Sequence, residues 1–262
     1  MIPLATQHER ARFDFIRRAS RGRCVLNCNT LVFRVLTGLL ITGGMALAQS
    51  PTRPDVTAAE KADFEHVGCV PVAERPHSKL GCFVIASQVL GKLASTPLYW
   101  HLYSYPTLAA ANVARGHSGT VVETYDKTWL FTIAEAGWNA SGGQRIARIG
   151  PLPINSANSY TAVYMAATFV PGMKSRVHRH PGPEAWYVLA GEQCLETPGH
   201  KQVVRAGESG IVEQGPPMML SGIGKAERRA LVLILHDSSQ PMTAPAGDWT
   251  PAGLCADDDT HH

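Results

Sequence analysis

The stretch GMKSRVHRHPGPEAWYVLAG, residues 172–191, decides the fold of this 262-residue chain. Its histidines, His178 and His180, lie two positions apart, and residues two apart on an extended strand point to the same face. The Pro-Gly-Pro that follows cannot continue a regular strand, because proline lacks an N–H donor and has a fixed φ. We therefore expect the chain to turn there and to return Glu184 toward the two imidazoles. Two neutral imidazoles and one carboxylate suit iron, manganese, zinc or nickel.

The spacing in this stretch resembles the first signature motif of the cupin superfamily, G-x5-H-x-H-x3-E-x6-G. Every fixed position is filled, from Gly172 to Gly191. The resemblance implies a mainly β protein built around a double-stranded β-helix, which is a small jelly-roll barrel. It also implies a mononuclear site for a divalent transition metal, held by His178, His180 and Glu184. The motif selects no single activity, because one fold supports many functions.

A second cupin motif, roughly G-x5-P-x-G-x2-H-x3-N, is only partly preserved after Gly207. Gly215 fills the second glycine position, and Glu213 replaces the proline. Met218 replaces the usual fourth ligand, histidine, and Gly222 replaces the asparagine. A thioether is a poor ligand for zinc, iron or manganese, although it is soft enough for copper. We therefore expect Met218 at the fourth corner of the cavity and only three protein ligands to a metal.

Three side chains are candidates for contact with a ligand. Arg176 has the same strand parity as the histidines, so it either faces the pocket as a fork for an anion or lies in solvent as a loop arginine. Trp186 shares parity with Glu184 and either lines the cavity or belongs to the core. Met218 has the same two interpretations.

The charge of the chain is unevenly distributed. The formal net charge is +3, but residues 1–48 hold seven basic and two acidic residues. The remainder, 49–262, has 17 basic and 19 acidic residues and a net charge of −2. The basic excess therefore belongs to the first segment, and we expect no nucleic-acid-binding surface.

Residues 1–48 have the features of an export signal. Arginines between Arg17 and Arg34 precede the apolar run Val35–Met45, and Ala46-Leu47-Ala48 supplies a small-x-small cleavage pattern. The apolar stretch is too short to span a bilayer comfortably. We predict a cleaved signal peptide, a mature chain without a stable membrane span, and a periplasmic or secreted location. An uncleaved anchor and a cytosolic chain are the alternatives.

Four cysteines follow the predicted signal: Cys69, Cys82, Cys194 and Cys255. An even number in an oxidising compartment permits two disulfides, with three connectivities. Cys69 and Cys82 are close in sequence and form the pair that we favour. Four small buried thiols are the alternative.

Apolar patterns and turn residues divide the chain into a signal peptide at 1–48, an N-terminal mixed β segment at 49–150, a cupin barrel at 151–240 and a C-terminal tail at 241–262. The N-terminal segment is either an accessory β layer or a degenerate first barrel. The tail is proline-rich and polar, so we expect it on the surface. Helices are predicted at 58–64 and 108–114. Strands are predicted at 81–90, 98–103, 120–125, 128–133, 144–149, 160–170, 184–189, 192–197, 201–205 and 230–236.

Three functions are compatible with these observations. The first is an exported cupin that binds a small molecule at a mononuclear metal, as a metal-dependent oxygenase or isomerase if it is catalytic. The second is a metal-free module that binds a sugar or an acid, which the replacement of histidine by Met218 favours. The third is a structural barrel that assembles into homo-oligomers. The expected partners are accordingly a small-molecule ligand and, under the third hypothesis, further copies of the chain.

Overall fold

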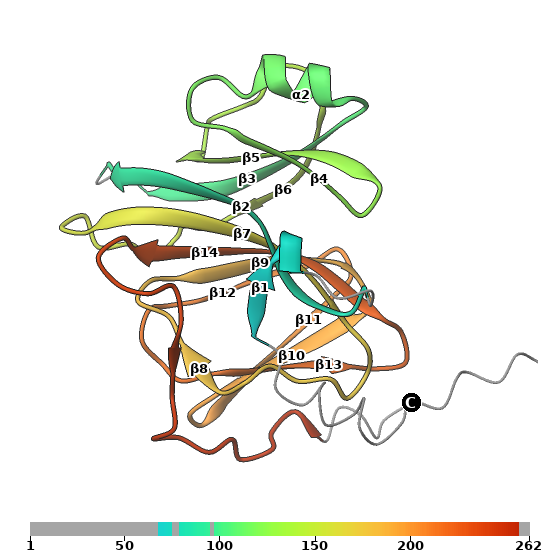
Figure 1. The fold of residues 1–262 in the computed structure, drawn as a ribbon, viewed down its shortest axis with the longest axis vertical. Coiled ribbons are helices and arrows are strands. Elements are labelled where there is room, and N and C mark those ends of the chain that lie inside the picture. Colours follow the sequence, from blue (N-terminus) through green and yellow to red (C-terminus); the bar gives the residue numbers. More distant parts are fainter. Residues whose placement is uncertain (1–67, 75–78, 95–96, 257–262) are drawn as a thin grey trace, which may run out of the picture. The chain divides into compact units, whose positions relative to one another are not determined.

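The computed structural model describes residues 68–74, 79–94 and 97–256, and Figure 1 shows their fold. The predicted signal peptide, its cleavage site and the helix at 58–64 lie outside the described residues. The described part is mainly β. Within it, no helix has the length and apolar character needed to cross a membrane.

The largest sheet has six strands, and two smaller sheets complete the barrel. The order in the large sheet is β1 (Cys69–Pro71), β2 (Gly81–Lys92), β7 (Ser159–Phe169), β14 (Arg228–Asp237), β9 (Glu184–Ala190) and β12 (Ser209–Val212). The second sheet contains β11 (His200–Arg205), β10 (Glu192–Thr197) and β13 (Met219–Ile223), and a two-stranded sheet pairs β15 (Ala244–Pro245) with β8 (His178–Arg179). These sheets form a jelly-roll barrel, and they include β1, β2 and β15, which lie outside the residues 151–240 predicted for the barrel.

A separate four-stranded sheet lies outside the barrel. Its order is β4 (Thr120–Thr124), β5 (Lys127–Glu135), β3 (Leu98–Tyr105) and β6 (Gln144–Ile149). It carries the helix α2 (Leu108–Ala114), whose N-cap Thr107 accepts a hydrogen bond from the backbone N–H of Ala110. A short 3-10 helix, η1 (Val72–Glu74), follows β1.

The six-stranded sheet, called the central sheet from here on, is buried on both faces along β7 and β14. Along β7, Met165 and Phe169 belong to the core inside the barrel, whereas Ala162 and Tyr164 belong to the core beneath the outer sheet. Successive side chains of a strand point to opposite faces, so a strand covered on both faces contains a nearly continuous apolar run. The apolar runs at 162–167 of β7 and 230–235 of β14 follow from this double burial.

Strands of the N-terminal segment belong to two sheets, the six-stranded sheet of the barrel and the separate four-stranded sheet. Strand β2 of this segment pairs with β7 in antiparallel register within the central sheet. Strands β3 to β6 form an accessory layer over the central sheet. In this layer the rings of Trp100 and Phe131 pack against Tyr164 of the central sheet, with centroid distances of 6.3 and 5.0 Å. The four strands within residues 98–149 thus form one sheet that packs against the six-stranded sheet.

The residues after 240 lie mostly on the surface, as the sequence predicted, but they are bound to the barrel, which the sequence did not predict. Residues 240–256, called the C-terminal strap from here on, run back along the barrel, and Cys255 forms a disulfide with Cys194 of β10. Ala246 and Cys255 are buried. The prediction relied on the polar, proline-rich composition, which gives no information on contacts with distant strands.

Both pairs of cysteines form disulfides. Cys69 pairs with Cys82, as the sequence favoured, and joins β1 to β2. The second bond, between Cys194 and Cys255, joins residues 61 positions apart in the sequence.

Candidate metal centre

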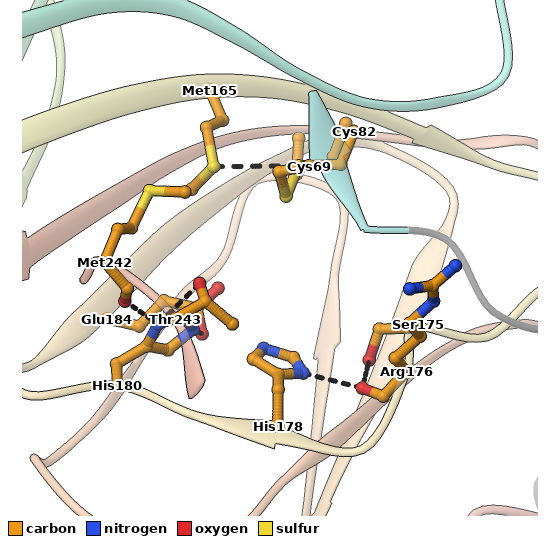
Figure 2. The surroundings of a disulfide bond; sticks show 12 residues. Cys69, Cys82, Met165, Ser175, Arg176, His178, His180, Glu184, Met242 and Thr243 are labelled. Carbon is orange, nitrogen blue, oxygen red and sulfur yellow. Dashed lines mark hydrogen bonds and ion pairs between the residues drawn. A yellow bond between two sulfur atoms is a disulfide. The ribbon is translucent and has the colours of Figure 1, made fainter. Parts of the chain in front are cut away.

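The histidines and the glutamate of the motif converge on one point. His178 begins β8, His180 directly follows that strand, and Glu184 begins β9 after the Pro-Gly-Pro turn. The ring centroids of the histidines are 4.8 Å apart, and the potential ligand atoms of all three residues lie within 4.8 Å of one another. Figure 2 shows these side chains on one side of a space, with the Cys69–Cys82 disulfide opposite them.

The backbone determines which nitrogen of each ring faces this space. Nδ1 of His178 lies 2.6 Å from the carbonyl oxygen of Arg176, and Nδ1 of His180 lies 2.7 Å from that of Met242. A carbonyl oxygen can only accept, so each Nδ1 must carry the proton that it donates. The lone pair of each Nε2 is therefore available, as in most metal-bound histidines.

Glu184 sets the charge of the site. Its Oε2 lies 3.4 Å from Nε2 of His180, and both side chains are largely buried. Burial opposes ionisation of both groups, but their attraction outweighs it: the pKa of His180 is raised and the pKa of Glu184 is lowered. Burial and the neighbouring His180 lower the pKa of His178, which favours its neutral form.

The donor set fits a divalent transition metal. Nε2 of His180 is buried and makes no hydrogen bond to any described residue, although the Glu184 carboxylate is nearby. The 3.4 Å ion pair with Glu184 is the contact of this nitrogen, and a metal bond would satisfy the buried atom more fully than a contact of that length. Two imidazoles and one carboxylate are ligands that iron, manganese, zinc and nickel accept.

Met218 lies opposite His178 but does not reach the cavity. The two backbones exchange hydrogen bonds of 3.1 and 2.8 Å, so the register is the one expected for the fourth corner. The Met218 side chain is fully buried in the core inside the barrel, together with Trp186. Among the described residues that line the cavity, neither Met218 nor Trp186 is present.

A cavity of about 320 Å³ lies over the three candidate ligands. Apolar side chains of the central sheet, among them Ala167 and Ile234, form much of its wall. Arg176 also lines it, and this side chain is exposed to solvent. The structure thus brings Arg176 to the cavity with His178, His180 and Glu184, and leaves Trp186 and Met218 in the core.

Three contributors to the cavity were not anticipated from the sequence. Met242 and Thr243 of the C-terminal strap line it, and so does the Cys69–Cys82 disulfide. Cys255 was the available signal for the strap, because a cysteine in a polar tail implies an anchor when the other cysteines can pair with it. No local pattern marks Met242, whose contribution to His180 is its backbone carbonyl.

Comparisons with known proteins locate the same domain. A family model for the cupin domain matches residues 165–233. No curated protein matches the chain.

Similar solved structures include a cupin-like protein from Thermotoga maritima MSB8, with 15% identity, a TM-score of 0.31, and coverage of 33% of this chain and 65% of that structure. An oxalate oxidase in complex with the substrate analogue glycolate shows 24% identity, a TM-score of 0.28, and coverage of 34% and 47%. A DMSP lyase from Ruegeria pomeroyi DSS-3 shows 21% identity, a TM-score of 0.29, and coverage of 32% and 43%. The aligned part of this chain thus spans less than two thirds of each structure.

The assignment of the domain rests on this chain's own features. The first motif is complete from Gly172 to Gly191, the family model covers residues 165–233, and strands β7 to β14 form the jelly roll. This chain carries a domain of the cupin superfamily.

Proposed function

We propose that this cupin domain binds one divalent transition metal, iron, manganese, zinc or nickel, through His178, His180 and Glu184, and a small molecule in the cavity above it. The observation that carries the proposal is the convergence of the three side chains within 4.8 Å, with Nε2 of His180 buried and without a hydrogen bond among the described residues. When bound, the metal would supply a Lewis acid or an oxygen-binding centre with open positions, as an oxygenase or isomerase requires.

The protein's own residues prepare the site for the metal. The carbonyl oxygens of Arg176 and Met242 hold the proton of each histidine on Nδ1, which leaves Nε2 to bind. Glu184 supplies the negative charge. Because the pKa of His180 is raised, a proton competes with the metal for Nε2, and metal binding should tighten as the pH rises through that pKa.

The cavity favours a small ligand with an apolar body and one anionic group. Its volume of about 320 Å³ is at the lower end of the range for ligand sites. The walls formed by Ala167, Val232 and Ile234 offer no hydrogen-bonding side chains, so they suit a hydrocarbon portion. Arg176 provides a guanidinium for a carboxylate or a similar anion.

We also propose that the protein is exported. The arginine-rich start, the apolar run and the small-x-small pattern of residues 1–48 support this. The pairing of Cys69 with Cys82 and of Cys194 with Cys255 supports it independently, because disulfides persist mainly in oxidising compartments.

Elemental analysis tests the metal proposal. The protein is purified without a His tag or chelating resin, and we expect about one metal ion per chain. The double variant His178→Ala, His180→Ala should contain none, because one carboxylate alone is a weak ligand. His200→Ala is the matched control, since His200 is exposed and belongs to β11. Wild-type protein that neither contains a metal nor takes one up from added iron, manganese, zinc or nickel would contradict the proposal.

A metal-free binding module is the second candidate. The contact of 3.4 Å between His180 and Glu184 favours it, because the two groups can neutralise each other without a metal. A thermal-shift screen of small carboxylic acids and sugars with chelator present separates the two candidates. Stabilisation that survives the chelator supports the metal-free module, and stabilisation that needs metal supports the first proposal.

A further inference from the structure

We propose that the C-terminal strap is a positioning element of the metal site, held in place by the Cys194–Cys255 disulfide; this rests on the metal function proposed above. The Met242 carbonyl accepts a hydrogen bond of 2.7 Å from Nδ1 of His180, and Oγ1 of Thr243 lies 3.3 Å from the same nitrogen. This contact keeps the proton on Nδ1 and the lone pair of Nε2 directed toward the other ligands. Figure 2 shows Met242 and Thr243 beside His180.

The contacts that hold the strap near the metal site are few. β15 pairs with β8 over two residues only, Ala244 with Arg179 and Pro245 with His178. Arg179 donates two hydrogen bonds of 2.7 Å to Asp248, in an ion pair whose side chains are 34% and 67% exposed. Ion pairs this exposed contribute little to stability.

The far end of the strap is anchored more firmly. Cys255 is bonded to Cys194, and both sulfur-bearing side chains are buried with Ile223. The backbone N–H of Gly253 donates a hydrogen bond of 3.0 Å to Glu196, whose side chain is fully buried. These residues belong to β10, β13 and the strap, so the anchor lies on the second sheet of the barrel.

Because the contacts near the metal site are weak, the Cys194–Cys255 disulfide determines whether the strap stays in place. Ordering each residue of a chain costs more free energy than a single hydrogen bond or exposed ion pair returns. Between Met242 and Gly253 the strap has mostly such contacts, apart from the buried Ala246 and the packing of Met242 against the core inside the barrel. The covalent bond removes much of this cost, because it confines the strap in every conformation that the chain can reach. Without it, the Met242 carbonyl would spend much of its time away from His180.

The experiment measures metal affinity and the position of the proton on His180 in the full-length chain. The variant Cys194→Ala, Cys255→Ala removes the anchor without adding polar atoms. We expect chelator competition to show a 10- to 100-fold loss of metal affinity, which is the usual effect of losing a partner of a ligating histidine. Nitrogen NMR of the metal-free protein, at a pH where His180 is neutral, should show Nδ1–H in the wild type and a mixture of tautomers in the variant.

Two further variants separate positioning from general loss of structure. Asp248→Asn leaves both disulfides intact and should weaken metal binding by about two- to threefold. Its matched control is Arg205→Gln, which breaks the ion pair between Arg205 and Glu192 at 3.1 Å on the second sheet and should not change metal affinity.

Each result decides the proposal. If the anchor variant folds and keeps both the wild-type metal affinity and the Nδ1–H tautomer, the strap is not a positioning element. If the anchor variant does not fold, Asp248→Asn decides, because the proposal requires a loss of metal affinity that Arg205→Gln lacks. If wild-type protein binds no metal, the metal function fails, and the NMR comparison alone decides whether the strap fixes His180.

Discussion

The same strands form both faces of the central sheet, but one face is fully packed and the other lines a cavity. On the outer face, Tyr164 of β7 is fully buried against Trp100 and Phe131 of the accessory layer. On the inner face, Ala167 of β7 and Ile234 of β14 line a cavity of about 320 Å³. The outer face is filled with aromatic rings, and the inner face leaves room for a ligand.

This difference indicates that the outer face contributes mainly to stability and the inner face mainly to ligand binding. An empty cavity forgoes packing contacts, so some other part of the molecule must supply the stability. The accessory layer supplies it by covering the outer face of β7, β9 and β14 with large side chains. Substitutions on the outer face should therefore change stability, whereas those on the inner face should change binding.

The largest effect is expected from Trp100→Ala. Trp100 is fully buried between the two sheets, so its truncation leaves a cavity and should lower the free energy of unfolding by about 3–5 kcal/mol. Chemical denaturation measures this change, and metal content serves as the control because the inner face is untouched. A loss of metal without a loss of stability would invalidate the division between the faces.

A matched pair of substitutions on β7 should give the next largest effect. Ala162 faces the accessory layer and Ala167 faces the cavity, and both are buried. Ala162→Leu has no space to fill and should destabilise the protein by about 1–3 kcal/mol. Ala167→Leu extends into the cavity, so it should cost less stability and should weaken ligand-induced thermal stabilisation. Equal losses of stability from both variants would mean that the two faces are packed alike.

The smallest expected effect is the pH dependence of the stability of the metal-free protein. It depends on Glu184 and His180, which lie at the cavity on the inner face. The lowered pKa of Glu184 contributes stability that is present above its unfolded value of about 4.3 and lost as the pH falls through the folded value. The raised pKa of His180 contributes stability that is present below about 6.5 and lost as the pH rises through the folded value.

Glu184→Gln isolates this contribution. The difference in free energy of unfolding between the wild type and this variant should be largest between about pH 4.3 and 6.5 and should shrink on either side. Denaturation of both proteins with chelator present, across this range, checks it. A difference that is constant with pH would show that the two groups do not stabilise each other as an ion pair.

The sequence by itself determined the local features of this protein. The helix at 108–114 and the strands at 144–149 and 192–197 have the bounds predicted for them, because strand and turn patterns and an N-cap act within a few residues. The spacing of His178, His180 and Glu184 also works locally, since strand parity and a Pro-Gly-Pro turn suffice to bring the three together. The pairing of Cys69 with Cys82 was favoured because the two residues are close in the chain.

Only the tertiary structure decided which distant residues complete the site. Met242 follows His180 by 62 positions, and its contribution is a backbone carbonyl that every residue type possesses, so no sequence pattern could reveal it. Met218 pairs with His178 as its register implies, yet whether its side chain reaches the cavity depends on the packing of the whole barrel. The position of the C-terminal strap depends on the bond between Cys194 and Cys255, residues that meet only when the barrel has closed. Patterns of polarity in the sequence indicate which residues are exposed to solvent. Contacts between segments far apart in the chain depend instead on the path of every strand between them.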